Sequence, residues 1–171
     1  VDGYTTDIDG EKRRLNPCDD NTKVENVTDT LRSLSCLAKE KSIYVAANIA
    51  TKSESESGGP EATKLWNTEV VLDSHGFVVA TYRKSQSYGG SPPFDTPAAD
   101  DLDVSWFSVS TDDVATLKIG LLICFDLEFA RPARSLVQEV GVDAILMSQY
   151  WVNTPPVSWS TLYQQAWSLM Y

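Results

Sequence analysis

The chain has 171 residues, and its 14 Lys and Arg against 24 Asp and Glu give it a formal net charge of −10. This acidic balance argues against a nucleic-acid or anionic-membrane partner, because phosphate binding depends on clusters of Lys and Arg. At 42% apolar and 22% charged residues, the composition is that of a globular protein, and one domain is the natural expectation for this length. No apolar run approaches the roughly 18 residues of a transmembrane helix, and the first residues lack the features of a signal peptide.

Residues 1–27 are charged, lack apolar periodicity and predict a loop. This loop contains Cys18, and Cys36 follows within the next predicted element. A bond between the two cysteines would stabilise the fold by about 3 kcal/mol in the chain-entropy model and would imply an oxidising compartment. The segment Asn26-Val27-Thr28 favours a secreted glycoprotein that is glycosylated at Asn26. The alternative is a pair of free thiols and an accidental sequon.

The next elements alternate between helix and strand. A helix is predicted after Thr28, and Ile43–Ile49 predicts a buried strand. The polar, low-complexity residues 52–64 predict a surface loop. Two β-rich runs within Glu69–Tyr82 surround a glycine-containing turn and predict a hairpin. His75 lies in that turn and is interpreted as a solvated residue rather than as a catalytic base or metal ligand. The apolar stripe of the helix predicted after Thr28 consists of Val27, Leu31, Leu34 and Ala38.

The second half of the chain continues this alternation. A strand over Leu117–Cys124 is followed by a helix over Arg131–Val140, in which Pro132 suits the first turn. A short buried strand over Ala144–Ser148 and a helix from Ser160 to Tyr171 complete the prediction. Apolar strands that alternate with helices indicate a layered α/β fold. The expected inner stripe of the last helix consists of Leu162, Ala166, Leu169 and Met170.

Cys124 ends a predicted buried strand and precedes a turn and a helix, which is where α/β folds expose reacting groups. A thiol in this position is either a small buried hydrophobe or a nucleophile. A nucleophilic thiol needs a base that takes its proton, and its oxyanion needs positive charge or N–H donors. Because the single His lies in a turn, the base would have to be a carboxylate, and Lys84 at the end of the hairpin is the best-placed cation.

Five blocks of the sequence are recognisable in their order and spacing. They resemble successive blocks of the biotinidase and vanin branch of the nitrilase superfamily, and the segment around Cys36 matches a half-cystine of that branch. The resemblance implies a nitrilase-like α-β-β-α sandwich, with residues 1–171 as a single domain that is incomplete at both ends. It also implies a Glu-Lys-Cys triad that hydrolyses linear amides such as pantetheine or biotinyl derivatives. The blocks are Ser42–Ile49, Trp66–Gly76, Tyr82–Lys84, Ile123–Asp126 and Trp151–Asn153.

Roles for individual residues follow from the resemblance. It implies that Cys124 is the nucleophile and that Lys84 supports the oxyanion together with the backbone N–H of Phe125. Asp126 matches the aspartate beside the family's nucleophile. For this residue a structural hydrogen bond at the strand-to-helix turn is favoured over proton transfer.

The sequence departs from the family pattern at two acidic positions. The family's general-base Glu precedes an Asp-Gly that matches Asp2-Gly3, which puts Val1 in its place. The family's supporting Glu falls in Gly89-Gly90-Ser91, which contains no carboxylate. One hypothesis is therefore an amidohydrolase that works through a thioester and whose base lies outside these residues. The other is a secreted nitrilase-fold binding or structural protein that keeps the Lys and the Cys but lacks both carboxylates.

The resemblance also bears on partners. It implies a small-molecule amide as substrate and a homo-oligomer that associates through helices. Tyr150 and Trp151 fall where the family's strand ends near the pocket, and they are interpreted either as substrate-binding residues or as ordinary core aromatics. No cofactor is expected, and no metal site, because one His and a cysteine pair leave too few ligands for zinc. The cysteine pair and the sequon favour an extracellular location.

Overall fold

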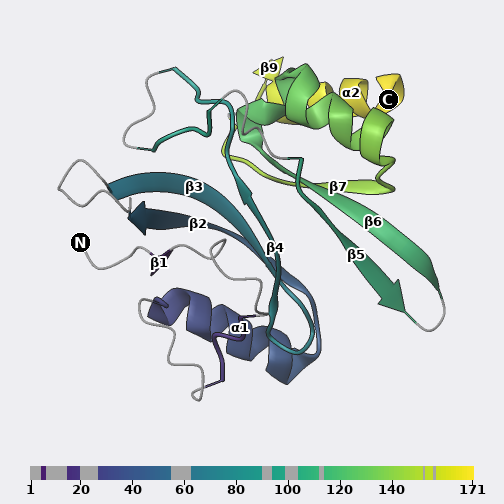
Figure 1. Ribbon diagram of the computed structural model, residues 1–171. Coiled ribbons are helices and arrows are strands. Elements are labelled where there is room, and N and C mark those ends of the chain that lie inside the picture. The colour runs from purple at the N-terminus through teal and green to yellow at the C-terminus, as the bar shows by residue number, and fades with distance from the viewer. Residues whose placement is uncertain are drawn as a thin grey trace.

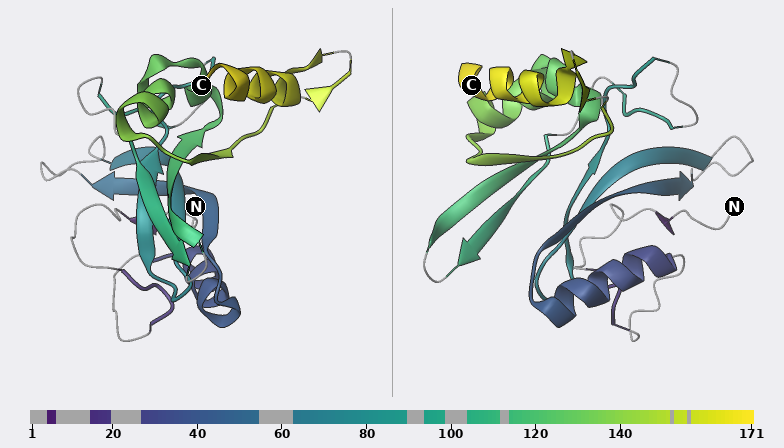
Figure 2. Two further views of the ribbon diagram at one scale, coloured as in Figure 1. Left: turned by 90° about the vertical axis from the view of Figure 1, so that its right-hand side faces the viewer. Right: turned by 180° about the vertical axis from the view of Figure 1, so that it is seen from behind.

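The protein is organised in four layers. A computed structural model describes residues 5–6, 15–19, 27–54, 63–89, 94–98, 104–111, 114–151, 153–155 and 157–171. Two β-sheets face each other, helix α1 (Asp29–Lys41) covers the outer face of one sheet, and further helices cover the outer face of the other (Figure 1). The same order of layers is visible from behind (Figure 2). The predicted α-β-β-α arrangement is therefore confirmed.

Helix α1 begins where the sequence predicts. Oγ1 of Thr28 accepts a hydrogen bond from the backbone N–H of Leu31 at 3.3 Å, which satisfies one donor of the first turn. The predicted apolar stripe faces the first sheet, where Leu31 and Ala38 are buried together with Val70 and Leu72. This packing fixes the helix against the hairpin of the sheet.

The first sheet contains four strands in the order β1-β2-β3-β4. The hairpin predicted over residues 69–82 is formed by β3 and β4, which pair antiparallel. Strand β2 pairs antiparallel with β3, so β3 lies inside the sheet. The bounds are Thr5–Thr6 for β1, Val45–Glu54 for β2, Thr63–Leu72 for β3 and Val78–Arg83 for β4.

The surface loop predicted over residues 52–64 is wrong at both ends. Lys52 pairs with Leu65, and Glu54 pairs with Thr63, so the β2–β3 ladder extends into the polar stretch. The side chain of Ser53 accepts a hydrogen bond from Nε1 of Trp66 at 2.9 Å. Backbone pairing and this contact compensate for the missing apolar residues. Residues 55–62 of the predicted loop lie outside the described ranges.

The second sheet has the strand order β5-β6-β7. Strand β6 pairs parallel with β7, with Ile123 opposite Ser148, and parallel pairing requires a crossover. The crossover consists of a 3₁₀ turn, η3 (Cys124–Glu128), and two π-helical turns, η4 (Ala130–Arg134) and η5 (Leu136–Val140). The strands are β5 (Trp106–Thr111), β6 (Val114–Ile123) and β7 (Ala144–Ser148), and β5 has no counterpart among the predicted elements.

The crossover helix departs from the prediction at its first residue. Arg131 has extended backbone angles, with φ −117° and ψ 124°, so regular turns start only at Pro132. This agrees with the preference of proline for a first helical turn. Ala133 and Leu136 of this segment are fully buried in a cluster with Leu122 of β6.

Helix α2 (Trp159–Met170) turns a different face inward from the one predicted. Tyr163 and Trp167 pack on the cluster around Leu122. The predicted inner stripe is exposed instead, at Leu162, Ala166, Leu169 and Met170. The two aromatic rings offer more apolar area than these aliphatic side chains, which explains the choice of face. A short ribbon of β8 (Asn153–Thr154) and β9 (Val157–Ser158) precedes the helix.

Apolar side chains from both sheets fill the space between them. Val71 and Tyr82 of the first sheet form a buried cluster with Leu121 and Ile123 of the second. Cys124 packs against the edge of this cluster. The core therefore ends at the carboxyl end of β6, directly below the thiol.

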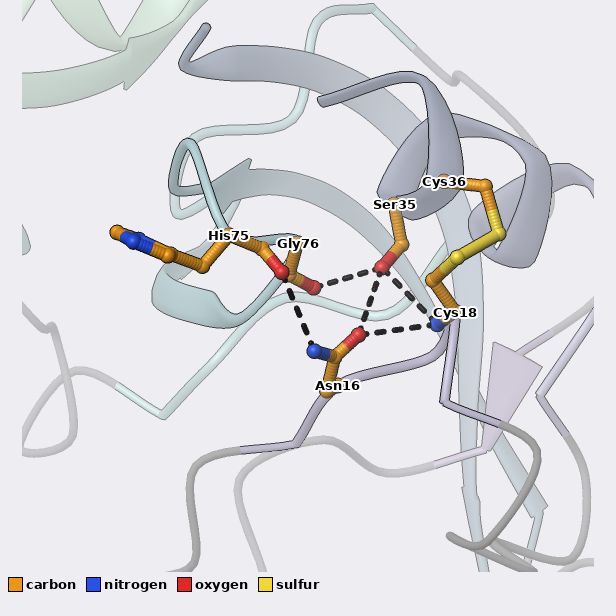
Figure 3. The surroundings of a disulfide bond; sticks show 6 residues. All are labelled: Asn16, Cys18, Ser35, Cys36, His75 and Gly76. Carbon is orange, nitrogen blue, oxygen red and sulfur yellow. Dashed lines mark hydrogen bonds between the residues drawn. A yellow bond between two sulfur atoms is a disulfide. The ribbon is translucent and has the colours of Figure 1, made fainter. Parts of the chain in front are cut away.

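Cys18 and Cys36 form a disulfide, as predicted (Figure 3). The bond joins the loop before α1 to the middle of that helix. Asn26, the predicted glycosylation position, lies outside the described ranges.

Hydrogen bonds beside the disulfide connect α1 to the β3–β4 turn. Oγ of Ser35 donates to the carbonyl oxygen of Gly76 at 2.6 Å, and Nδ2 of Asn16 donates to the carbonyl oxygen of His75 at 3.2 Å. The His75 ring is exposed and points away from this network (Figure 3). His75 is therefore a turn residue whose backbone, rather than its ring, takes part in the contacts.

Candidate active site

Cys124 directly follows the carboxyl end of β6 and is the first residue of η3. Its φ of 53° falls in the left-handed region, which residues with a Cβ rarely adopt. The thiol is free and half-buried. Backbone strain at the junction of a strand and a turn is found at sites where a side chain is presented for chemistry. The backbone conformation therefore sets this cysteine apart from an ordinary core thiol.

Lys84 reaches the same point from the other sheet. Its Nζ donates a hydrogen bond at 2.7 Å to the carbonyl oxygen of Ile123, the residue before Cys124. Its backbone N–H donates to the carbonyl oxygen of Asn67 at 2.8 Å, which holds the end of β4 against β3. The structure thus brings together the lysine and the cysteine that the sequence analysis singled out.

The ammonium group of Lys84 lies in a largely desolvated setting. Only 12% of its side chain is exposed, and its Nζ lies 3.7 Å from Oδ1 of Asp126. Burial lowers the pKa of Lys84, whereas the negative charges of Asp126 and of a Cys124 thiolate raise it. A cation with so little water around it interacts strongly with an anion that forms beside it.

Asp126 is a fully buried acceptor of hydrogen bonds at the η3 turn. It receives the hydroxyl of Tyr82 at 2.8 Å and the backbone N–H groups of Gln86 at 2.7 Å and Ile123 at 3.2 Å. Burial raises the pKa of Asp126, and the Lys84 charge and these three donors oppose that shift. With donors on both oxygens, this carboxyl is suited to hold the turn in place rather than to exchange protons with a substrate.

Tyr82 and Ser85 complete this network. The Tyr82 hydroxyl lies 3.0 Å from Oγ of Ser85, and the same Oγ lies 3.3 Å from Oδ1 of Asp126. Burial, followed by the Asp126 charge, raises the pKa of Tyr82, so its phenol stays protonated and remains a donor. Neither residue was identified as a site residue from the sequence, because the only feature that they share there is a position close to Lys84 along the chain.

Three aromatic rings pack together around Phe125, the residue after the cysteine. Phe125 packs edge to face with Tyr88 at a centroid distance of 5.2 Å and with Phe129 at 5.1 Å. Tyr88 is 64% exposed, so this group of rings borders solvent. The role of the Phe125 backbone N–H in an oxyanion site stays a prediction.

The two aromatic residues interpreted as substrate-binding residues or as core aromatics differ in their surroundings. Tyr150 is 98% exposed, and Trp151 packs edge to face on Tyr163 of α2 at 5.7 Å. Their part in substrate binding stays a prediction.

A cavity of about 460 Å³ between η5, β7 and α2 is separate from the candidate site, since neither Lys84 nor Cys124 lines it.

The positions that match the family's acids are only partly described. Val1, Asp2 and Gly3 lie outside the described ranges, as do Gly90 and Ser91. Gly89 is exposed, and a Cβ at this position would have no atom within 4 Å. The loop after Lys84 therefore leaves open space at its described end.

Glu69 belongs to the surroundings of the site, although no sequence motif marked it. It lies on β3, paired with Tyr82 of β4, and its side chain is fully buried. The one sequence feature at this position is an acidic residue directly before the apolar run Val70–Leu72. The whole segment was interpreted as part of a hairpin. Within the described ranges no group of three or more His, Cys, Asp or Glu could hold a metal ion.

Comparison with known proteins identifies the family. A sequence profile described as carbon-nitrogen hydrolase matches residues 16–169. The chain belongs to the carbon-nitrogen hydrolase family. It is 34% identical to the pantetheinase of Mus musculus over 97% of this chain and 32% of that protein. It is 32% identical to the biotinidase of Takifugu rubripes over 94% of this chain and 31% of that protein.

Solved structures of other carbon-nitrogen hydrolases share the fold. An amidase from Nesterenkonia sp. AN1, in a form with acrylamide added at its active site cysteine, is 21% identical with a TM-score of 0.56, over 81% of this chain and 48% of that one. The nitrilase-type architecture is thereby confirmed. The chain spans about a third of the length of the pantetheinases and biotinidases that it matches. No helix in the described ranges has the length and apolar character to cross a membrane.

Proposed function

We propose that the chain is part of an amidohydrolase of the vanin and biotinidase type, which cleaves a linear amide through Cys124 and a thioester. Residues 1–171 would form part of a single carbon-nitrogen hydrolase domain. The similarity to pantetheinases and biotinidases supports a pantetheine-like or biotinamide-like substrate.

The contact of Lys84 with the strand end that carries Cys124 is the observation that supports this function most directly. The lysine Nζ lies 2.7 Å from the carbonyl oxygen of the residue before the cysteine. Its charge is poorly screened, because 12% of the side chain is exposed. A fixed cation beside a strained cysteine is what acyl transfer to sulfur requires.

The proposed reaction has two halves. A base takes the Cys124 proton, Sγ bonds to the carbonyl carbon, and the carbonyl electron pair moves onto oxygen, where Lys84 and the N–H of Phe125 stabilise it. The C–N bond then breaks, and the amine leaves with the proton from the base. Water, deprotonated by the same base, attacks the thioester, which releases the acid and restores the thiol.

The base is the part that these residues do not supply. The position that matches the family's Glu is Val1 here, so the proposal assigns no residue of this sequence as the base. Asp126 is a poor substitute, because the hydrogen bonds of Tyr82, Gln86 and Ile123 already occupy it.

A second candidate function is a binding or structural protein of nitrilase fold without turnover. The segment Gly89-Gly90-Ser91, which has no carboxylate where the family has its supporting Glu, favours it. In this case the Cys124 region would bind an amide without cleaving it.

Hydrolysis of a pantetheine analogue and of a biotinyl amide by the full-length protein tests the proposal. We expect turnover that falls by at least about 10³-fold in Cys124→Ala and stays unchanged in Lys118→Ala, which changes a lysine on β6 remote from the thiol. Turnover that survives Cys124→Ala would rule out the cysteine mechanism. Binding of the analogue by calorimetry, without any hydrolysis in the wild type, would establish the second function instead.

An extracellular location is also proposed. The Cys18–Cys36 disulfide supports it, because such bonds persist in oxidising compartments. If Asn26 is glycosylated, glycosidase treatment should lower the intact mass of the protein, and an unchanged mass would contradict glycosylation.

The exposed apolar face of α2, with Leu162 and Leu169, is consistent with a homo-oligomer, which light scattering of the purified protein would detect.

A further inference from the structure

Glu69 is an anomaly among the buried residues. Its side chain has no exposed surface, and neither carboxylate oxygen has a hydrogen-bond partner among the described residues. Buried polar groups in native proteins almost always have partners, and an unpaired buried charge is costly. An exception of this kind calls for an explanation in terms of function.

The position of Glu69 places it directly behind the candidate site. Within the first sheet it is flanked by Asn48 of β2 and Tyr82 of β4. From the second sheet it is faced by Ser148, which pairs with Ile123 beside Cys124. Glu69 therefore lies between the two strand ends that carry the lysine and the cysteine.

Glu69 is suited to hold a proton in this place. Burial raises the pKa of Glu69, and the nearby side chains of Ser148 and Asn48 only partly offset that effect. A neutral carboxylic acid both donates and accepts one hydrogen bond. Nδ2 of Asn48 already donates to Oδ1 of Asn67 at 2.7 Å, which leaves the Asn48 oxygen free to accept the Glu69 proton. The Ser148 hydroxyl, which faces Glu69 from the other sheet, is a donor suited to the other Glu69 oxygen.

We propose that Glu69, as an uncharged acid, is a positioning residue of the Cys124 site that links Asn48 in one sheet to Ser148 in the other. The link keeps the ends of β4 and β6 at a fixed separation, and thereby holds Lys84 beside the cysteine. It is not assigned as the general base, since its oxygens make no hydrogen bond with the thiol in the described part of the chain. The proposal rests on the proposed hydrolase only for its turnover measurement.

Ionisation of Glu69 would break the Asn48 half of this link, because the charged form has no proton to donate, whereas the Ser148 hydroxyl can still donate to it. The charged form would also place a second negative charge at the end of the sheet that carries the cysteine. The titratable group paired with it in the sheet is Tyr82, and Lys84, Cys124 and Asp126 follow at the ends of β4 and β6, whereas Asn48 and Ser148 do not titrate. Of these only Lys84 is cationic, and Asp126 already holds it.

The test compares Glu69→Gln, Glu69→Ala and Ser148→Ala with a matched control, Thr68→Val. Thr68 is the preceding residue of β3, is buried on the opposite face, and shares a 2.6 Å hydrogen bond with Thr51. Two readouts are measured on the full-length protein from pH 5.5 to 9: the rate of Cys124 alkylation by iodoacetamide, and kcat and KM for a pantetheine analogue. Alkylation reports on the site even if the protein does not turn over, so failure of the proposed function leaves this test intact.

We expect the alkylation rate of Glu69→Gln relative to the wild type to rise with pH, to about twofold, because the variant carries no anion near the thiolate. We expect Glu69→Ala and Ser148→Ala to lower kcat about tenfold with KM nearly unchanged, since misplacement acts on the chemical step, and Thr68→Val to leave both readouts unchanged. Identical alkylation profiles of Glu69→Gln and wild type would overturn the proposal. An unchanged kcat in Ser148→Ala would do the same, even if Glu69→Ala does not fold.

Discussion

The Nζ of Lys84 and the carbonyl oxygen of Ile123 are joined by a 2.7 Å hydrogen bond that crosses from one sheet to the other. This contact fixes the ammonium group before any substrate arrives. An ammonium group has three N–H donors, so this bond leaves two, and the Nζ also forms an ion pair with Oδ1 of Asp126 at 3.7 Å. Such preorganisation is the largest contribution that a fixed charge makes to catalysis.

Replacement of Lys84 by Ala should therefore lower kcat by about 10²- to 10³-fold, the usual effect of losing one oxyanion donor. The KM should change little, because the interaction develops only as negative charge forms. Steady-state kinetics on the pantetheine analogue would measure both values. Lys118→Ala is the matched control. An equal loss in both lysine variants would point to general charge effects.

Replacement of Tyr82 by Phe should lower the free energy of unfolding by about 1–2 kcal/mol, because Asp126 loses a buried donor. Tyr88→Phe is a suitable control. Its ring is 64% exposed, and a surface change of this kind stays within about 0.5 kcal/mol. Urea denaturation of both variants would separate the two outcomes, and equal stability would show that the Tyr82 hydroxyl does not hold the turn.

Glu69 should make stability depend on pH in a defined direction. Its pKa is raised by burial, so the folded state holds the proton over a pH range in which the unfolded state has released it. Stability from this group is complete below the unfolded pKa near 4.5 and falls as the pH rises through the folded pKa. The Glu69→Gln variant lacks this loss. Its melting temperature should match the wild type at pH 4 and exceed it at pH 8, and a constant difference across this range would refute the assignment.

Local patterns in the sequence were sufficient for elements whose signals lie within them. Helix α1 carries its own cap at Thr28, and β7 is a continuous apolar run, so both occur where predicted. The face of α2 could not be predicted in this way. Two apolar stripes run along that helix, and only contact with Leu122 decides that Tyr163 and Trp167 face inward.

In the candidate site, too, some residues could be predicted from local patterns and others could not. The rule that reacting groups lie at strand ends, together with the family resemblance, predicts from the sequence that Lys84 and Cys124 lie close together. The environment of Glu69 depends on Ser148 of the other sheet, almost eighty positions further along the chain. No pattern within one strand contains that information, and burial of an acidic residue runs against the usual preference of glutamate for solvent.

Gly76 offers a last test, one that concerns the junction of α1 with the hairpin. Its φ is 86°, and a Cβ there would lie 2.9 Å from the carbonyl oxygen and from Oγ of Ser35. Gly141 also has a positive φ, 69°, but a Cβ there would meet nothing within 4 Å. Gly141→Ala should therefore cost only the backbone strain, about 1 kcal/mol, whereas Gly76→Ala should cost clearly more. The added Cβ of Gly76→Ala must also displace Ser35, which donates to the Gly76 carbonyl beside the Cys18–Cys36 disulfide. Urea denaturation of the two variants would compare these losses, and equal losses would mean that the turn yields without disturbing the helix.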